Sequence, residues 1–150
     1  MPRPAKNRLV NSPPVYCDFK PCGTRGRDLG KVDLSIDEFE AIRLADLEGM
    51  DHETAAASMN ISRPTFSRLI EKARRKIAEF LMEGKHLKIN GGNIHFKKNI
   101  FKCNSCGEIS RQCMRKEFTD CPNCKSSDVT NIASEMGHGN CCRTETKEPL

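Results

Sequence analysis

The 150-residue sequence has no tryptophan, a single tyrosine and seven phenylalanines, so aromatic residues make up only 5% of it. A chain of this length with so few large side chains is too poor for one large core, and fits one ordinary domain or two very small ones. It also lacks an apolar run of the roughly 18 residues that span a bilayer. Met1–Pro4 is not followed by the apolar stretch of a signal peptide. We therefore expect a soluble, cytoplasmic protein with no membrane partner.

Motifs of the common enzyme classes are missing as well. The sequence contains no nucleophile elbow, no phosphate-binding loop and no zinc-protease helix. We therefore predict that the protein is not an enzyme.

Charge is plentiful and is arranged in blocks. Residues 1–31 carry seven Lys or Arg against two Asp, residues 33–53 carry eight acids against one Arg, and residues 63–76 carry six Lys or Arg against one Glu. Concentrated positive charge indicates a polyanionic partner such as nucleic acid. A solvated basic helix face with no partner is the alternative that charge alone leaves open.

Composition divides the chain into five segments. The predicted fold is mainly α: a three-helix, winged-helix-like domain followed by a small β zinc ribbon. The segments are an extended basic N-terminal arm (1–31), a helical domain (32–83), a linker or short hairpin (84–100), a cysteine module (101–133) and a flexible tail (134–150) that contains a His and Cys cluster.

Capping residues set the expected helix boundaries. Ser35 and Glu38 have the spacing of a capping box and begin the first helix. Asp51 is a good N-cap for a second helix over His52–Met59, and Asn60–Ser62 forms a short turn. Ser62 then caps a third helix, with Pro64 in its first turn. This pattern predicts a helix-turn-helix over 52–70, although a structural three-helix unit would show part of it.

In a helix-turn-helix the third helix reads the major groove. We expect side chains near its start to meet base edges, and those further along to contact phosphate. The first group comprises Arg63, Thr65, Ser67, Arg68 and Lys72, and the second comprises Arg74 and Arg75, followed by Lys76. An apolar stripe continues through Ala73, Ile77, Phe80 and Leu81, and either forms a homodimer seam or packs on the N-terminal arm.

Four of the nine cysteines form two Cys-x-x-Cys pairs: Cys103 with Cys106, and Cys121 with Cys124. This spacing predicts a closed, structural zinc site with four sulfur ligands, and favours zinc over iron. The remaining thiols are either ordinary reduced cysteines or ligands of a second metal or iron–sulfur cluster. The residues for such a second site are Cys17, Cys22, Cys113, His138, Cys141 and Cys142.

Several longer motifs together resemble a family of small bacterial and archaeal proteins of uncharacterised function that are predicted to bind DNA. The motifs are Phe19-Lys20-Pro21, LSIDEFEAIRLADLEG over 34–49, SRPTFSR over 62–68 and ARRK over 73–76. The resemblance covers about residues 1–92 and implies a fold similar to region four of sigma factors, with a role in transcription. Cys22 and the cysteine module depart from the family pattern.

Three functions follow as hypotheses. The first is a sequence-specific, double-stranded DNA-binding transcriptional regulator with a structural zinc site. The second is a metal- or redox-sensing protein whose cysteines carry the function. The third is an adaptor that binds RNA polymerase.

Overall fold

The structure, a computed structural model, describes residues 7–113 and 119–136. Within these ranges the chain forms four α-helices and eight strands. In order these are β1 (Arg8–Val10), β2 (Asp18–Phe19), β3 (Lys31–Leu34), α1 (Ile36–Ile42), α2 (His52–Met59), α3 (Arg63–Glu83), β4 (His86–Ile89), β5 (Ile94–Phe96), β6 (Lys98–Cys103), β7 (Ile109–Cys113), β8 (Val129–Asn131) and α4 (Ile132–Glu135). A 3-10 turn, η1 (Gly26–Asp28), precedes β3, and a π-helical segment, η2 (Arg43–Leu47), extends α1.

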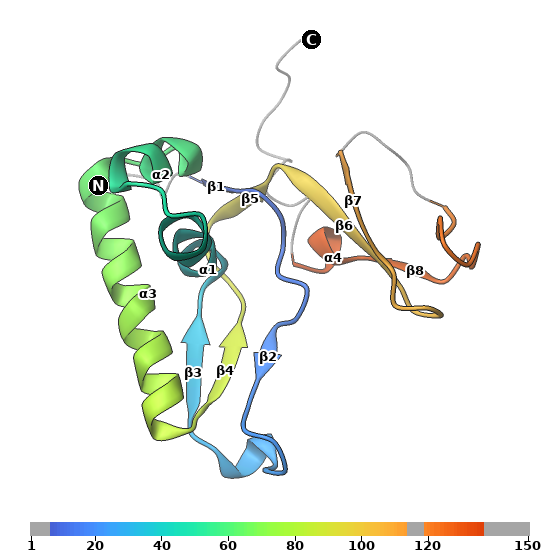
Figure 1. Ribbon diagram of the computed structural model, residues 1–150, viewed down its shortest axis with the longest axis horizontal. Coiled ribbons are helices and arrows are strands. Elements are labelled where there is room, and N and C mark those ends of the chain that lie inside the picture. Colours follow the sequence, from blue (N-terminus) through green and yellow to red (C-terminus); the bar gives the residue numbers. More distant parts are fainter. Residues whose placement is uncertain (1–6, 114–118, 137–150) are drawn as a thin grey trace, which may run out of the picture.

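The expectation of a mainly α protein is wrong, because the fold is mixed α/β with three small sheets (Figure 1). β2, β4 and β3 form one sheet, in which β3 is parallel to β4 and β2 is antiparallel to it. β1 and β5 form a two-stranded parallel pair. Segments 1–31 and 84–100, expected as an arm and as a linker or hairpin, therefore contain four strands of these two sheets, β1, β2, β4 and β5, and β3 begins at the boundary residue Lys31.

These strands escaped the sequence analysis for a physical reason. Each has two to four residues, which is too short to show a two-residue hydrophobic period. Their partners also lie far away in the sequence: Leu9 pairs with His95, and Val32 pairs with Leu87. β4 and β5 are close in sequence but lie in different sheets, so they do not form a hairpin.

The helical boundaries follow the caps. Ser35 and Glu38 form both hydrogen bonds of the capping box, with the Ser35 N–H donating to Glu38 Oε2 at 3.0 Å. Asp51 Oδ1 accepts from the backbone N–H of Thr54, and Ser62 Oγ accepts from that of Thr65. The predictions of a helix over His52–Met59 and of a helix capped by Ser62 are confirmed.

Asn60 makes the turn between α2 and α3. It has φ of 56° and ψ of 44°, which is the left-handed conformation. In this conformation the N–H groups of Asn60 and Ile61 donate to the carbonyl oxygens of Ala57 and Ala56, which ends α2. The turn therefore fixes the direction in which α3 leaves α2.

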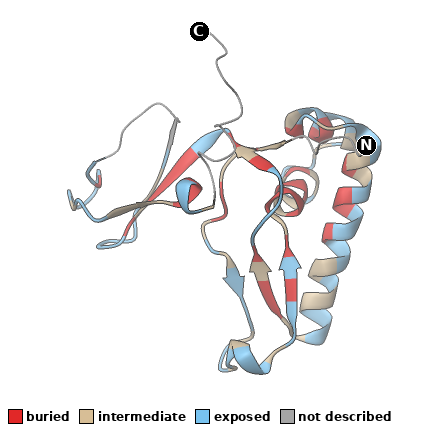
Figure 2. Cartoon of the chain, turned by 180° about the vertical axis from the view of Figure 1, so that it is seen from behind, coloured by how far each residue is buried: buried red, intermediate tan, exposed pale blue. Residues whose placement is uncertain are grey.

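Two apolar cores lie inside the molecule, and α3 packs on both. The helical core lies between α1, η2, α2 and the first half of α3, whereas the sheet core lies between the strands and the second half of α3 (Figures 1 and 2). The helical core consists of Ala41, Leu44, Ala55, Ala56, Met59, Phe66, Leu69 and Ile70. The sheet core consists of Val10, Val32, Leu34, Ile36, Ala73, Leu87, Ile89, Ile94, Phe96 and Ala133.

The cysteine module contains the third sheet, with antiparallel strands in the order β7, β6, β8. β8 leads directly into α4, where Ala133 is fully buried in the sheet core and Met136 packs against it. The segment after β8 thus connects the module to the rest of the fold. Among the helices of the described ranges, none has the length and apolar character needed to cross a membrane.

The turn at Asn60 gives a testable prediction. Replacement of Asn60 by Ala should lower the free energy of unfolding by about 1 kcal/mol, because a Cβ-bearing residue without a polar side chain disfavours the left-handed conformation. Asn60→Gly is the matched control and should change it by no more than about 0.5 kcal/mol, since glycine adopts this conformation freely. Urea unfolding of the two variants measures both values, and equal losses would show that the backbone conformation is not the cause.

Candidate functional site

The exposed face of α3 carries most of the side chains expected to contact DNA. Phe66, Leu69, Ile70 and Ala73 form the buried face of the helix. The opposite side is open to solvent (Figure 2) and presents Arg63, Arg68, Lys72, Arg74 and Arg75, together with Pro64 and Glu71. The structure therefore brings five of the six predicted basic side chains onto the outside of one helix, whereas the sixth, Lys76, is half-buried and paired with Glu38.

These five side chains differ in how strongly they are held. Within the described residues, Arg68 has no ion-pair partner, and Arg75 has only a 3.9 Å contact with Glu71 one turn away. An exposed pair of this kind contributes little energy. Arg63 forms no salt bridge, but it lies near a carboxylate: hydrogen bonds with Thr54 lower the pKa of Asp51, and the charge of Arg63 adds to this effect. These three guanidinium groups are therefore available to an external anion.

Lys72 and Arg74 instead contact acids of the preceding helices. Arg74 binds Asp46 through two hydrogen bonds of 3.2 and 2.7 Å, which raise the pKa of Arg74 and lower the pKa of Asp46. Lys72 Nζ lies 3.7 Å from Glu38 Oε1. Any anion that binds these two cations competes with a carboxylate already present.

Thr65 and Ser67 make internal hydrogen bonds. Ser67 Oγ lies 2.8 Å from His52 Nδ1, so this hydroxyl faces α2. Thr65 Oγ1 lies 2.7 Å from Ser62 Oγ at the start of α3. Both hydroxyls thus help to hold α3 in place against α2 and its own cap.

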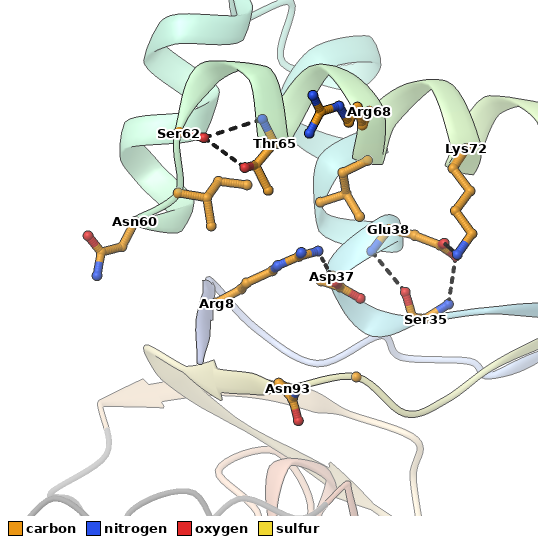
Figure 3. Close-up of a pocket in the computed structure, with 13 residues that line it drawn as sticks. Arg8, Ser35, Asp37, Glu38, Asn60, Ser62, Thr65, Arg68, Lys72 and Asn93 are labelled. Carbon is orange, nitrogen blue, oxygen red and sulfur yellow. Dashed lines mark hydrogen bonds and ion pairs between the residues drawn. The ribbon is translucent and has the colours of Figure 1, made fainter. Parts of the chain in front are cut away.

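An open cleft of about 1070 Å³ lies beside the first half of α3 (Figure 3). One wall is α3, and the other combines β1, the start of α1 and the loop before β5. Its lining residues are Arg8, Ser35, Asp37, Glu38, Asn60, Ile61, Ser62, Thr65, Arg68, Leu69, Lys72, Gly92 and Asn93. The sequence analysis did not identify Arg8 or Asp37, because nothing local to either residue marks them as neighbours across 29 positions.

The four cysteines of the two Cys-x-x-Cys pairs meet at one end of the third sheet. Their sulfur atoms all lie within 4.8 Å of one another, with 3.5 Å between the Sγ atoms of Cys103 and Cys124 and 3.6 Å between those of Cys106 and Cys121. A tetrahedral ion with metal–sulfur bonds of about 2.3 Å places its sulfurs about 3.8 Å apart. The arrangement therefore fits a single metal ion with four sulfur ligands.

The two knuckles have the same backbone structure. In the first, the N–H of Cys103 donates to the Glu108 carbonyl and the N–H of Gly107 donates to the Cys103 carbonyl. In the second, Cys121 and Ser126 form the first bond, and Lys125 and Cys121 form the second. Gly107 and Lys125 occupy equivalent positions, and both have positive φ, of 79° and 62°. The two Cys-x-x-Cys loops thus have the same backbone geometry, although the residues between and after their cysteines differ.

The ionisation of these thiols also favours a cation. The backbone N–H of Cys106 is the largest influence on Cys103 and lowers its pKa to about 6. The backbone N–H of Ser126 lowers the pKa of Cys124, but hydrogen bonds with neighbouring thiols and burial outweigh it and raise that pKa to about 12. Cys103 thus favours its thiolate form, and Cys124 keeps a proton that the two sulfurs share. A divalent ion bound by both sulfurs would replace that proton.

Cys17 and Cys22, the other cysteines whose side chains the structure describes, are not grouped in this way. Among the described residues, only the four-cysteine centre brings three or more metal-ligating side chains together. Burial is the main cause that raises the pKa of Cys17, so this thiol favours its protonated form, and Cys22 is exposed. Cys113 lies in β7, where its backbone pairs with Lys98. His138, Cys141 and Cys142, the other residues of the predicted second site, lie outside the described residues.

Metal content tests the centre directly. We expect one divalent ion per chain with four sulfur neighbours, and we expect Cys121→Ser to lose it, because a buried ligand is removed. Cys22→Ser is the matched control and should keep the ion. Elemental analysis combined with X-ray absorption spectroscopy measures both quantities. Retention of a four-sulfur ion in Cys121→Ser would place the metal elsewhere.

The pH dependence of metal binding provides a second test. A metal ion must displace the proton of Cys124, so affinity should fall as the pH falls. Below about pH 6 the thiolate of Cys103 also takes up a proton, and the loss of affinity per pH unit should become steeper. Competition titrations with a chromophoric chelator between pH 5 and about 8 measure this slope. A slope that does not change across this range would contradict the assigned ionisation of Cys103.

Comparison with known proteins identifies relatives over most of the chain. A family profile described as a protein of unknown function, DUF134, matches residues 1–97. A UPF0251 protein of Pelotomaculum thermopropionicum is 44% identical over 132 residues, which cover 88% of this chain and 99% of the relative. A UPF0251 protein of Halothermothrix orenii is 50% identical over 107 residues, covering 71% and 79% of the two chains.

A third relative, the UPF0251 protein of Desulfosudis oleivorans, is 52% identical over 93 residues, which cover 62% of this chain and 67% of the relative. No solved structure matches the chain. The match over residues 1–97 includes the helices α1 to α3 and the strands up to β5, and the identity to the Pelotomaculum protein extends over most of the cysteine module's length as well. The chain therefore belongs to the DUF134 family, also named UPF0251.

Proposed function

We propose that this protein binds double-stranded DNA by inserting the first half of α3 into the major groove, and that it acts as a transcriptional regulator. The observation that carries the proposal is the pair of exposed guanidinium groups of Arg63 and Arg68 on the first turns of α3, neither of which forms a salt bridge among the described residues. The left-handed turn at Asn60 and the packing on α2 hold these turns at a fixed angle. A helix presented in this way has the geometry of a helix-turn-helix reader.

The roles of the individual side chains follow from their positions. Arg68 lies in the second turn of α3, where an arginine can donate two hydrogen bonds to a guanine edge. Arg75 lies two turns further along and is exposed, so it suits a phosphate contact. Because Arg74 is bound to Asp46 and Lys72 to Glu38, these two contribute less to binding than their charge suggests.

The four-cysteine centre has a structural role in this proposal. Zinc is the ion that best suits four sulfur ligands in a closed tetrahedral site. A closed site has no free coordination position for water or substrate, so the ion would supply folding energy to a module with a small core. The position of α4 supports this role, because β8 and α4 join the module to the sheet core.

Selection from a random duplex library at roughly physiological salt tests the proposal, since non-specific affinity is low there. The wild-type protein should enrich a defined motif. Arg68→Ala should lose the preference at one position of that motif, at a cost of about 1–3 kcal/mol. Arg75→Ala is the matched variant on the same helix, and should weaken binding to all sequences equally and reduce the salt dependence.

Other outcomes would point to the other hypotheses. If metal-loaded protein enriches no motif but binds RNA polymerase, the adaptor role is favoured and direct reading of DNA is excluded. If the purified protein contains iron with labile sulfide, the cysteines carry a redox function. If Arg68→Ala weakens specific and random duplexes equally, Arg68 does not read a base.

A further inference from the structure

The cleft beside α3 contains a cation that the proposed function does not use. Arg8, at the start of β1, extends across the cleft opposite α3, and its side chain is 29% exposed (Figure 3). Its Nη1 donates to Asp37 Oδ2 at 2.5 Å. Because the guanidinium group is rigid and planar, this hydrogen bond also fixes the directions of its other N–H donors.

The surrounding structure holds this pair firmly. Asp37 is largely buried, and a buried ion pair of this kind rarely contributes net stability over an apolar pair. The adjacent loop is tied on both sides, since the Arg8 N–H donates to the Asn93 carbonyl and the Ile36 N–H donates to the Gly91 carbonyl. Gly92 has φ of 103°, and a Cβ there would lie 3.0 Å from Asp37 Oδ1. The fold thus positions Arg8 without an evident gain in stability.

The charges of the cleft leave it able to accept an anion. Asp37 is paired with Arg8, and Glu38 is paired with Lys76 at 2.8 Å and with Lys72 at 3.7 Å. Arg68, on the α3 wall, has no carboxylate partner among the described residues. Both acids are therefore neutralised, and Arg68 remains as an excess positive charge.

The lining also indicates the class of ligand. Pockets for small organic molecules are lined mainly by apolar and aromatic side chains. Ile61 and Leu69 are the only large apolar residues lining this cleft, within the part of the chain that the structure describes. An open cleft with several charged side chains, which continues the exposed face of α3, suits a hydrated polyanion better than a small apolar effector.

We propose that this cleft holds a phosphodiester group of one DNA strand, with Arg8 binding it from one wall and Arg68 facing the adjoining groove from the other. Asp37 is the positioning residue, because it orients the Arg8 guanidinium and does not itself meet the phosphate. This inference rests on the proposed function of α3 and extends it to a second, non-helical contact. DNA would then be clamped between α3 and the β1 side of the cleft.

The double variant Arg8→Gln/Asp37→Asn tests this inference. It removes both charges of the pair but leaves the net charge of the protein unchanged. Affinity for the duplex selected by the wild type should fall roughly tenfold, the loss of one charge-assisted hydrogen bond. Because the pair is neutral before and after the exchange, the slope of log affinity against log salt concentration should stay the same, so the lost affinity is that of a specific contact and not of net charge. Fluorescence anisotropy over a salt series measures both effects.

The ion pair between Arg27 and Asp28 provides the matched control. It lies in η1, at the end of the sheet where α3 finishes, and Lys72, the cleft residue nearest to that end, is roughly 16 Å along the helix from its last residue. Arg27→Gln/Asp28→Asn should leave affinity and slope unchanged. Arg8→Lys keeps the charge and the pairing with Asp37, so it should fold normally and lose only part of the affinity. Circular dichroism and metal content should match the wild type for the variants compared.

The results separate this inference from the proposed function. If the wild type binds a defined duplex and Arg68→Ala loses preference, but the Arg8 variants bind as the wild type does, the cleft does not hold a phosphate. If the wild type binds no duplex, the proposed function fails and the inference fails with it. If both the Arg8 and the Arg27 double variants bind the duplex more weakly than the wild type, the effect comes from surface charge in general and not from the cleft. That result would also overturn the inference.

Discussion

The packing of α3 on two separate cores is the constraint on which the rest of the structure depends. Phe66, Leu69 and Ile70 of its first half enter the helical core, and Ala73 enters the sheet core, with Ile77 and Phe80 packed beside it. The two halves of the apolar stripe of α3 pack on different cores. Rotation of α3 about its axis would therefore expose apolar surface of both cores to water. The direction of every exposed side chain on α3 is therefore fixed, and that direction determines what the helix can contact.

The parallel pairing of β3 with β4 depends on the same helix. Two neighbouring parallel strands need a connection that carries the chain from the end of the first strand back to the edge of the sheet where the first strand began. Here that connection consists of α1, η2, α2 and α3. At the other side, β8 and α4 connect the cysteine module to the sheet core through Ala133. The module is thus joined to the core on which the second half of α3 rests, because the same short helix packs on both.

Local chemistry was enough to predict α2, the start of α3, the turn at Asn60 and the four-cysteine group, since caps, turn residues and ligand spacing act over a few residues. The strands at Arg8–Val10 and His86–Ile89 could not be predicted in this way, because their pairing depends on segments more than 50 residues away. At the site, the sequence placed Arg63 and Arg68 on one helix. It gave no sign that Ser67 faces His52, that Arg74 binds Asp46, or that Arg8 binds Asp37 in the cleft.

Hydrogen exchange of the backbone amides, with and without a selected duplex, tests most directly the claim that the first half of α3 meets DNA. The account predicts added protection in Asn60–Lys72 and in Arg8–Val10, which line or border the cleft, and none in η1 at the far end of α3. Protection confined to the cysteine module, with α3 unchanged, would contradict it and would assign binding to the other part of the molecule.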